Sequence, residues 1–270
     1  MISFPNAKIN LGLNIIEKRS DGYHNISSCF YPVPINDVLE INLSDKFDFK
    51  ISGTPIPGNK NENLVVKAYK LLKKDFNLPE VAIHLHKNIP MEAGLGGGSS
   101  DGGFALKMLN EFFDLYLDDS VLEDYAGMLG SDCPFFIYNE PMLVGGRGEE
   151  MNAIKVDLKG YYICILKPQL SISTKEAYQG VKPAKPDYSI QSIIISKPVV
   201  KWKNFLKNDF EAPMLKKYPE LSSLKDRLYD MGAEYASLTG SGSAIYGLFN
   251  AEPVLHKDIT QNYFNWVGSL

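Results

Sequence analysis

The chain has 270 residues and a formal net charge of −4, with 44% hydrophobic and 22% charged residues. This length suffices for one large domain or two modest ones, and the composition is ordinary for a globular protein. The negative net charge argues against a nucleic-acid binder that relies on a basic surface. No apolar run approaches the roughly eighteen residues of a membrane-spanning helix, so we expect neither nucleic acid nor membrane as a partner.

The three cysteines are far apart and form no C-x-x-C pair. This sparse, odd set is typical of reduced thiols in a cytoplasmic protein and not of a disulfide framework. Residues 1–5 do not begin a basic and then long apolar segment, so no secretory signal is expected. The four histidines show no metal-binding spacing. A cytoplasmic location is therefore predicted.

In chain order, the first predicted element is a strand over residues 8–16. Its apolar residues alternate with Lys8, Asn10, Gly12 and Asn14 on the opposite face. That polar face fits either a solvated sheet edge or a site that uses Lys8 and Asn10. Next, Asp21-Gly22 is the pivot of a predicted turn that carries Tyr23 and His24.

Residues 38–43 and 47–52 are predicted to form a hairpin. A helix follows, with Asn61 or Asn63 as its N-cap and an apolar stripe from Leu64 to Leu72. Residues 81–86 alternate like another strand.

The most informative stretch is residues 90–101, PMEAGLGGGSSD, between that strand and an amphipathic helix. Ser99, Ser100 and Asp101 suit the helix N-cap and first turn. Glycines there allow backbone N–H groups to converge on an anion at the positive helix end, and the expected anion is a phosphate. Neither a Walker lysine nor the third glycine of G-x-G-x-x-G is present. The alternative interpretation is a flexible linker.

The remaining elements complete an α+β pattern. Asp132 lies between a helix and Cys133-Pro134, where it is either an ordinary turn residue or a functional carboxylate. Residues 239–243, TGSGS, form a turn that is either a simple hairpin or a ligand turn. The strand and helix alternation after residue 160 suits a ferredoxin-like unit. The helix after the glycine-rich stretch is predicted to end near Asp114. Further predicted helices cover 120–129, 173–179, 200–208, 221–231 and 253–263, and predicted strands cover 135–138, 142–147, 161–167, 234–238 and 244–249.

Four segments of the chain resemble one family. Residues 90–100 are similar to the phosphate loop of the GHMP kinases (galactose, homoserine, mevalonate and phosphomevalonate kinases). Residues 5–11 (PNAKINL), 19–24 (RSDGYH) and 130–136 (GSDCPFF) narrow the resemblance to the 4-diphosphocytidyl-2-C-methyl-D-erythritol kinases. The resemblance covers about residues 3–250. A mevalonate or homoserine kinase and a non-catalytic nucleotide sensor on the same fold are the alternatives.

The resemblance implies a fold and an activity. The fold is α+β with two domains: a mixed β/α ATP-binding domain at 1–155 and a ferredoxin-like domain at 156–270. The activity is ATP-dependent phosphorylation of the 2-hydroxyl of a cytidine diphosphate conjugate in non-mevalonate isoprenoid synthesis. ATP and Mg²⁺ are the implied cofactors, and the protein is expected to be a monomer or a homodimer.

The resemblance also implies site residues. Lys8 and Asp132 are the implied catalytic pair, with Asp132 taking the proton of the acceptor hydroxyl. The implied ATP-binding residues are Asn63, Pro90, Gly94, Leu95, Gly96, Gly97, Gly98, Ser99 and Ser100. The implied substrate-binding residues are Asn10, Tyr23, His24, Asp132, Tyr178, Gly240, Ser241 and Gly242. Either Ser99 or Ser100 is expected to help hold the metal. Gly102-Gly103 depart from the family, which usually has alanines there.

Overall fold

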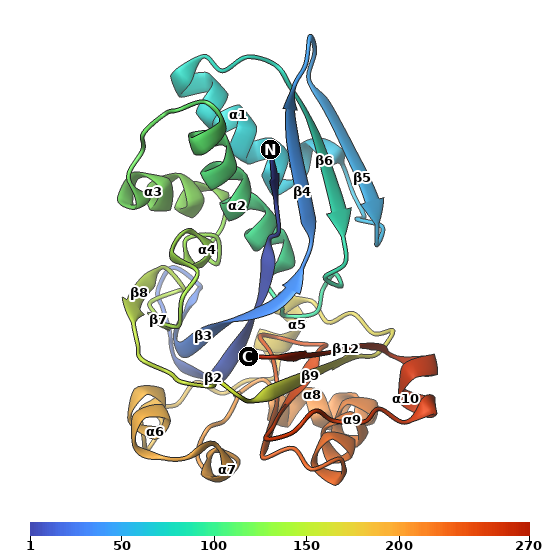
Figure 1. Cartoon of the computed structure of the whole chain (residues 1–270). Coiled ribbons are helices and arrows are strands. Elements are labelled where there is room, and N and C mark those ends of the chain that lie inside the picture. The colour runs from blue at the N-terminus through green and yellow to red at the C-terminus, as the bar shows by residue number, and fades with distance from the viewer. The chain divides into compact units, whose positions relative to one another are not determined.

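The computed structural model describes all 270 residues, and its chain folds into two compact units (Figure 1). The first unit comprises residues 1–7, 35–91 and 96–140, and the second comprises residues 8–34, 92–95 and 141–270. The chain therefore passes from the second unit into the first between Leu95 and Gly96, within the glycine-rich stretch.

The first unit contains a four-stranded sheet in the order β1-β4-β6-β5. The strands are β1 (Ile2–Ser3), β4 (Val38–Leu43), β5 (Asp48–Gly53) and β6 (Val81–Lys87). β6 lies between β4 and β5, antiparallel to β4 and parallel to β5. The predicted hairpin of residues 38–52 is therefore wrong, although both strands exist: β6 takes the position that a hairpin partner would hold.

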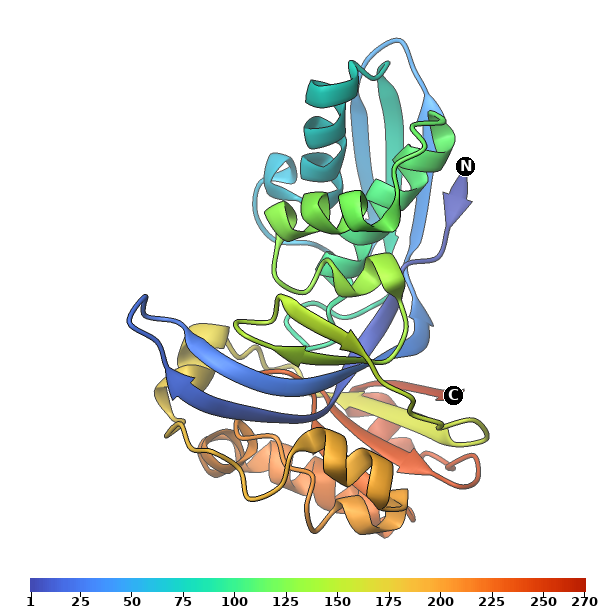
Figure 2. The same cartoon turned by 90° about the vertical axis from the view of Figure 1, so that its left-hand side faces the viewer.

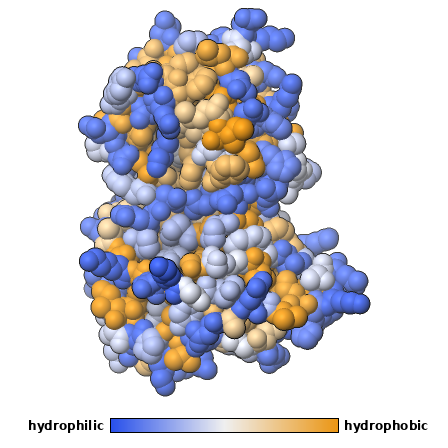
Figure 3. Space-filling model, viewed as in Figure 1, coloured by the Kyte–Doolittle hydropathy of each residue, from blue (hydrophilic) through white to orange (hydrophobic).

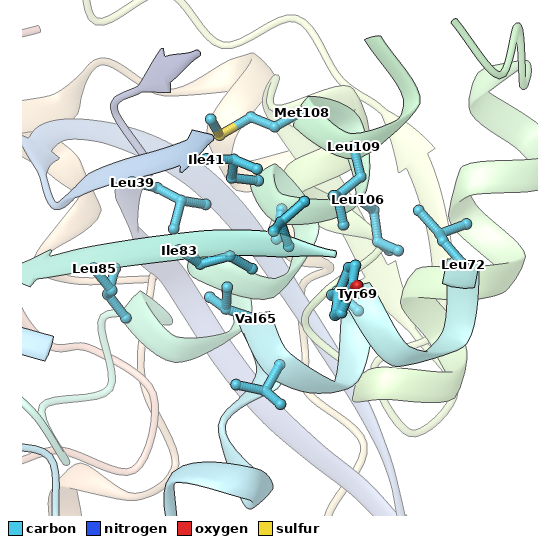
Figure 4. Close-up of a cluster of buried hydrophobic side chains, with 14 of the residues drawn as sticks. Leu39, Ile41, Val65, Tyr69, Leu72, Ile83, Leu85, Leu106, Met108 and Leu109 are labelled. Carbon is cyan, nitrogen blue, oxygen red and sulfur yellow. The ribbon is translucent and has the colours of Figure 1, made fainter. Parts of the chain in front are cut away.

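Helices α1 and α2 of the first unit pack on one face of this sheet, and α3 and α4 pack against α2 (Figure 1). These helices are α1 (Leu64–Phe76), α2 (Gly97–Phe112), α3 (Asp119–Leu129) and α4 (Phe135–Tyr138), with a 3-10 turn η1 (Lys60–Glu62) before α1. Leu39, Ile41 and Ile83 of the sheet meet Tyr69 of α1 and Leu106 of α2 in a buried cluster (Figure 4). Removing this apolar area from water holds the layers together.

Two local predictions in this unit fail. α2 begins at Gly97, with Gly96 in the N-cap position and no side-chain cap, so Ser99 lies in the first turn, as predicted, but is not the N-cap. Residues 135–138 form the short helix α4 and not a strand, because Phe135 and Phe136 are fully buried within a helical turn. Asn63, by contrast, caps α1 as one of the two predicted candidates, its Oδ1 accepting from the Val65 N–H at 2.9 Å.

The second unit contains two sheets. The first has the order β2-β3-β7-β8, in which β2 (Asn6–Lys18) and β3 (His24–Asn36) form a long curved ribbon beside the hairpin of β7 (Met142–Gly145) and β8 (Glu150–Ala153) (Figure 2). Lys8 and Asn10 on β2 are 3% and 1% exposed. Their polar face is therefore not a solvated edge.

The other sheet is antiparallel with the order β10-β11-β9-β12. With α9 between β9 and β10 and α10 between β11 and β12, this is the β-α-β-β-α-β arrangement of a ferredoxin-like unit, as predicted. The strands are β9 (Tyr162–Lys167), β10 (Tyr235–Leu238), β11 (Ile245–Phe249) and β12 (Phe264–Ser269); the helices are α5 (Thr174–Gln179), α6 (Ile190–Ser196), α7 (Val199–Trp202), α8 (Glu211–Lys217), α9 (Pro219–Asp230) and α10 (Lys257–Asn262).

Hydrophobic residues on the face seen in Figure 3 form separate groups among hydrophilic ones. None of the helices combines the length and the apolar character that crossing a bilayer requires.

Candidate functional site

The first turn of α2 is built as an anion cradle. Gly96 has φ +71°, a left-handed angle that favours glycine, and it turns the chain into the helix. The first N–H groups of an α-helix have no acceptor within the helix, and the helix dipole adds positive potential at that end. Because no side chain caps α2, the N–H groups of Gly97, Gly98 and Ser99 remain available for a ligand.

The three consecutive glycines of this turn serve different purposes. A Cβ at Gly97 would lie 2.9 Å from the Ile89 side chain, so packing excludes larger residues there. A Cβ at Gly98 would have no atom within 4 Å. A glycine in a helix lowers stability relative to alanine, and packing does not require one at position 98. Gly98 instead leaves open space directly at the cradle.

The two serines of this turn differ. Ser99 is partly exposed, and its hydroxyl hydrogen-bonds with the Cys133 thiol, whose pKa burial raises to about 12. Ser100 is fully buried, and its Oγ has no hydrogen-bond partner. Ser99 is thus the serine that a bound molecule can reach.

The first unit brings Asn63 and Asp132 to this turn. A Cβ at Gly102 of α2 would lie 3.0 Å from Leu64, the residue after Asn63. Asp132 lies in the turn between α3 and α4, next to the Cys133 that contacts Ser99. The N-terminus of α1 and the turn of Asp132 therefore both lie close to the N-terminus of α2.

Lys8 begins a buried polar network in the second unit. Its ammonium group donates to Oδ1 of Asn10 at 2.9 Å and lies 4.2 Å from the centre of the Phe30 ring. The Asn10 Nδ2 donates to Ser28 Oγ at 2.9 Å, and Ser28 Oγ donates to the Gly12 carbonyl at 2.7 Å. A buried, fully hydrogen-bonded network of this kind fixes the position of the charge that it carries.

The same Asn10 holds the turn at 239–242. Its Oδ1 accepts from the Gly240 N–H at 2.9 Å, and its N–H donates to Thr239 Oγ1 at 3.2 Å. Thr239 Oγ1 in turn donates to the carbonyl of Gly94 at 3.0 Å. A Cβ on Gly94 would lie 2.0 Å from the Thr239 carbonyl, so the two glycine-rich turns touch backbone to backbone. Ser241 is partly exposed and Gly242 is buried.

The predicted aromatic residues do not all lie together. His24 stacks on Tyr178 of α5, with ring centres 4.7 Å apart and planes 19° apart. Tyr178 also meets Phe210 edge to face at 5.0 Å. Tyr23 is 59% exposed and lies under the Arg147 guanidinium at 5.3 Å. Burial lowers the pKa of His24, and the positive charge of Lys18 lowers it further, so its imidazole is neutral at neutral pH.

Sequence reasoning missed Ser28 and Thr239 as members of the Asn10 network. Both are small hydroxyl residues in ordinary strand and turn contexts, and only their long-range contacts reveal a role. Pro90, which precedes the loop, is partly exposed. No group of three or more His, Cys, Asp or Glu residues is arranged to hold a metal ion.

Comparison with known proteins agrees with this architecture. Residues 63–140 match the GHMP kinases N terminal domain, and residues 200–257 match the GHMP kinases C terminal domain. The chain is 51% identical over 275 residues to the 4-diphosphocytidyl-2-C-methyl-D-erythritol kinase of Bacteroides thetaiotaomicron, covering 100% of both chains. The enzyme of the same name from Bacteroides fragilis is 50% identical over 261 residues, with 95% of each covered.

Among solved structures, a crystal structure of 4-(cytidine 5'-diphospho)-2C-methyl-D-erythritol kinase matches 100% of this chain and 98% of its own, with a TM-score of 0.83 and 28% identity. The match in sequence over the full length and the match in fold agree with each other. The chain therefore belongs to the 4-diphosphocytidyl-2-C-methyl-D-erythritol kinase family of GHMP kinases.

Proposed function

We propose that this protein uses ATP to phosphorylate the 2-hydroxyl of 4-diphosphocytidyl-2-C-methyl-D-erythritol in the non-mevalonate route to isoprenoid precursors. The observation that carries the proposal is the roughly half-identical sequence, over the full length, of two relatives named for this substrate. The cradle at α2 and the buried ammonium of Lys8 supply the chemistry that a phosphoryl transfer requires.

The phosphates of ATP are proposed to bind at the first turn of α2. The N–H groups of Gly97, Gly98 and Ser99 point out of the helix end, and the open space at Gly98 allows close approach. Gly94, Leu95, Gly96, Ser100 and Pro90 shape this turn. Asn63 caps α1 with its Oδ1, and its Nδ2 is proposed to meet the adenine.

Mg²⁺ is proposed to accompany the phosphates. Magnesium usually keeps several waters and takes phosphate oxygens with one or two protein oxygens, so it requires no preformed cluster of carboxylates. Ser99, partly exposed on the cradle, is the residue that would hold it. When bound, the ion would neutralise part of the negative charge on the phosphates.

Asp132 and Lys8 are proposed to act on the phosphoryl group that is transferred. Asp132 takes the proton from the 2-hydroxyl of the acceptor, while the oxygen of that hydroxyl bonds to the γ-phosphorus of ATP. The bond from that phosphorus to the bridging oxygen breaks, and ADP leaves. Lys8 stabilises the negative charge on the transferring group. Asn10 is proposed to hold Lys8 and the turn of Gly240, Ser241 and Gly242 in place for the acceptor.

The cytosine of the acceptor is proposed to stack on Tyr178. His24 occupies one face of this ring, so we infer that the base takes the place of the imidazole. His24 then reads the polar edge of the base as a neutral hydrogen-bonding group, and Tyr23 closes the stack from the other side. Base–aromatic stacking of this kind contributes about 1–3 kcal/mol per base.

Two broader assignments accompany this function. We keep a division into an ATP-binding domain, 1–155, and a ferredoxin-like domain, 156–270, which separates the two family segments. A cytoplasmic location is supported by three buried cysteines that form no disulfide.

Phosphorus NMR of the reaction tests the proposal. With Mg-ATP and the cytidine diphosphate conjugate, we expect a new phosphomonoester signal coupled to the 2-position carbon. A new signal on another carbon would contradict the assigned hydroxyl, and ATP consumption without a new phosphoester would contradict the kinase activity.

A further inference from the structure

A buried ion cluster lies directly beneath the phosphate cradle. Lys87, the last residue of β6, donates to Asp37 Oδ2 and, at 2.8 Å, to Asp101 Oδ2. The side chains of Lys87 and Asp37 are 0% exposed and that of Asp101 is 2% exposed. Charges are buried this completely only when they are paired, and the phosphoryl transfer proposed above does not use these three residues.

The cluster ties three segments to the cradle. Asp101 belongs to the first turns of α2, and the Lys87 Nζ would lie 3.2 Å from a Cβ placed on Gly97. Asp37 Oδ1 accepts the N–H groups of Asn88 at 2.6 Å and Ile89 at 2.9 Å. These two residues open the segment that leads into the glycine-rich stretch. The ammonium of Lys87 thus joins both ends of that stretch within the first unit.

We infer that Lys87 is a positioning residue that holds the first turn of α2 in the geometry that binds the phosphates of ATP, with Asp37 as its charged partner and Asp101 as a neutral acid. This inference rests on the function proposed above. It assigns the two carboxylates, which contact the same ammonium group, to different protonation states.

The hydrogen bonds separate the two carboxylates. Asp37 accepts two backbone N–H groups as well as the ammonium, so both of its oxygens are hydrogen-bonded by donors. Asp101 accepts the ammonium through Oδ2 and no backbone N–H group, and its Oδ1 is buried without a partner. Burial raises the pKa of Asp101 well above its usual range; Lys87 opposes this, and the charge of Asp37 adds to it.

The charge balance agrees with this assignment. Two ionised carboxylates and one ammonium would leave a net negative charge beneath a site that binds a triphosphate. With Asp101 protonated, the cluster is neutral. The positive end of α2 then faces the phosphates without an opposing buried charge.

The first experiment replaces Lys87 by methionine and measures Michaelis constants for ATP and for the acceptor, together with the affinity for Mg-ATP by calorimetry. We expect a rise of more than tenfold in the constant for ATP, with less than threefold change for the acceptor. The matched control is Lys73→Met. Lys73 also pairs with a carboxylate, Glu80, but on the outside of α1, and its replacement should leave both constants within twofold.

If Lys87→Met does not fold because Asp37 is left unpaired, the double variant Lys87→Met/Asp37→Asn removes both charges and restores a neutral interior. A folded double variant with normal affinity for ATP would overturn the inference. Equal losses for ATP and acceptor would overturn it too, because they would indicate a general structural role.

The two carboxylates provide the second test. Asp37→Asn should raise the Michaelis constant for ATP more than tenfold, whereas Asp101→Asn, which resembles a neutral acid, should raise it less than threefold. The infrared carbonyl band of a protonated, buried carboxylic acid should be present in the wild-type protein and absent only from Asp101→Asn. Equal effects of the two changes, or no such band, would contradict the assignment. A wild-type protein that does not bind Mg-ATP at all would instead refute the proposed function.

Discussion

Asn10 Oδ1 accepts a hydrogen bond from the Lys8 ammonium at 2.9 Å while it also accepts the Gly240 N–H at 2.9 Å. One amide oxygen thereby sets the position of both a buried positive charge and the turn beside it. The Asn10 Nδ2, which donates to Ser28, fixes the orientation of that amide. The orientation of Lys8 thus depends on contacts made by residues more than two hundred positions away.

The first prediction concerns this amide. Asn10→Ala removes one hydrogen-bond partner from each of a buried ammonium, a hydroxyl and an N–H group, so the free energy of unfolding should fall by about 3 kcal/mol. Urea denaturation measures it. Asn14→Ala is the control on the same strand, because the Asn14 Nδ2 makes one weaker bond, to Asp209 at 3.3 Å, and its loss should be about 1 kcal/mol or less. Similar losses at the two sites would show that the network adds no stability.

The second prediction concerns the proposed base. Asp132→Asn keeps the shape of the side chain but removes the proton acceptor, so turnover should fall by roughly two orders of magnitude or more. Acceptor affinity should remain within a few-fold. Lys8→Met should lower turnover similarly and also weaken binding. Near-normal turnover of Asp132→Asn would mean that the enzyme works by positioning alone.

The third prediction uses Gly98. Valine at Gly96 or Gly97 would disturb the fold, since Gly96 has a left-handed angle and Gly97 lies against Ile89. Alanine at Gly98 meets no atom within 4 Å, so it should stabilise α2 by up to about 1 kcal/mol while it weakens ATP binding. Isothermal calorimetry and thermal unfolding measure the two effects.

Gly127→Ala is the matched control for Gly98→Ala, since Gly127 lies in α3 with equally open space around it. It should give the same gain in stability with unchanged ATP affinity. If Gly98→Ala also bound ATP normally, the phosphates would have to lie elsewhere.

The fourth prediction concerns the base of the acceptor. Tyr178→Ala should raise the Michaelis constant for the cytidine conjugate by about five- to a hundred-fold, from the loss of stacking. Tyr23→Ala should act in the same direction, and the constant for ATP should change little in both. His24→Ala should reduce the preference for cytidine over uridine conjugates. Equal losses for ATP and acceptor would assign these rings to the fold.

The fifth prediction follows from His24, whose pKa is lowered mainly by burial and further by Lys18. A lowered pKa in the folded state means that folding favours the neutral imidazole. Its contribution to stability is complete above about pH 6.5, the ordinary value, and is lost as the pH falls through the lowered pKa. Between pH 7.5 and 5, Tm should fall further for the wild-type protein than for His24→Phe, which keeps the ring stack but does not titrate. Equal falls would contradict this assignment.

The sequence predicted most of the elements because their signals are local. Asn63 is followed by an apolar stripe of helical spacing, and α1 begins immediately after it. The ferredoxin-like unit followed from the same kind of local pattern. β12 was missed, because Phe264–Ser269 carries no clear alternation and becomes a strand through its pairing with β9.

Predictions that depended on distant partners failed or were absent. The strands at 38–43 and 48–53 looked like a hairpin because nothing in them indicates that β6 inserts between them. Lys87 and Asp37 are 50 residues apart and Lys87 and Asp101 are 14 apart, so no motif signalled their cluster. The backbone contact of Gly94 with Thr239 was likewise invisible, although each turn was recognised separately.

The most direct measurement of the central claim is ADP release with Mg-ATP and a set of acceptors: 4-diphosphocytidyl-2-C-methyl-D-erythritol, its uridine analogue, mevalonate and homoserine. We expect rapid, stoichiometric ADP release with the cytidine conjugate, much slower release with the uridine analogue, and none above background with the others. Faster turnover of mevalonate or homoserine, or no turnover of the cytidine conjugate by a protein that binds ATP, would contradict that claim.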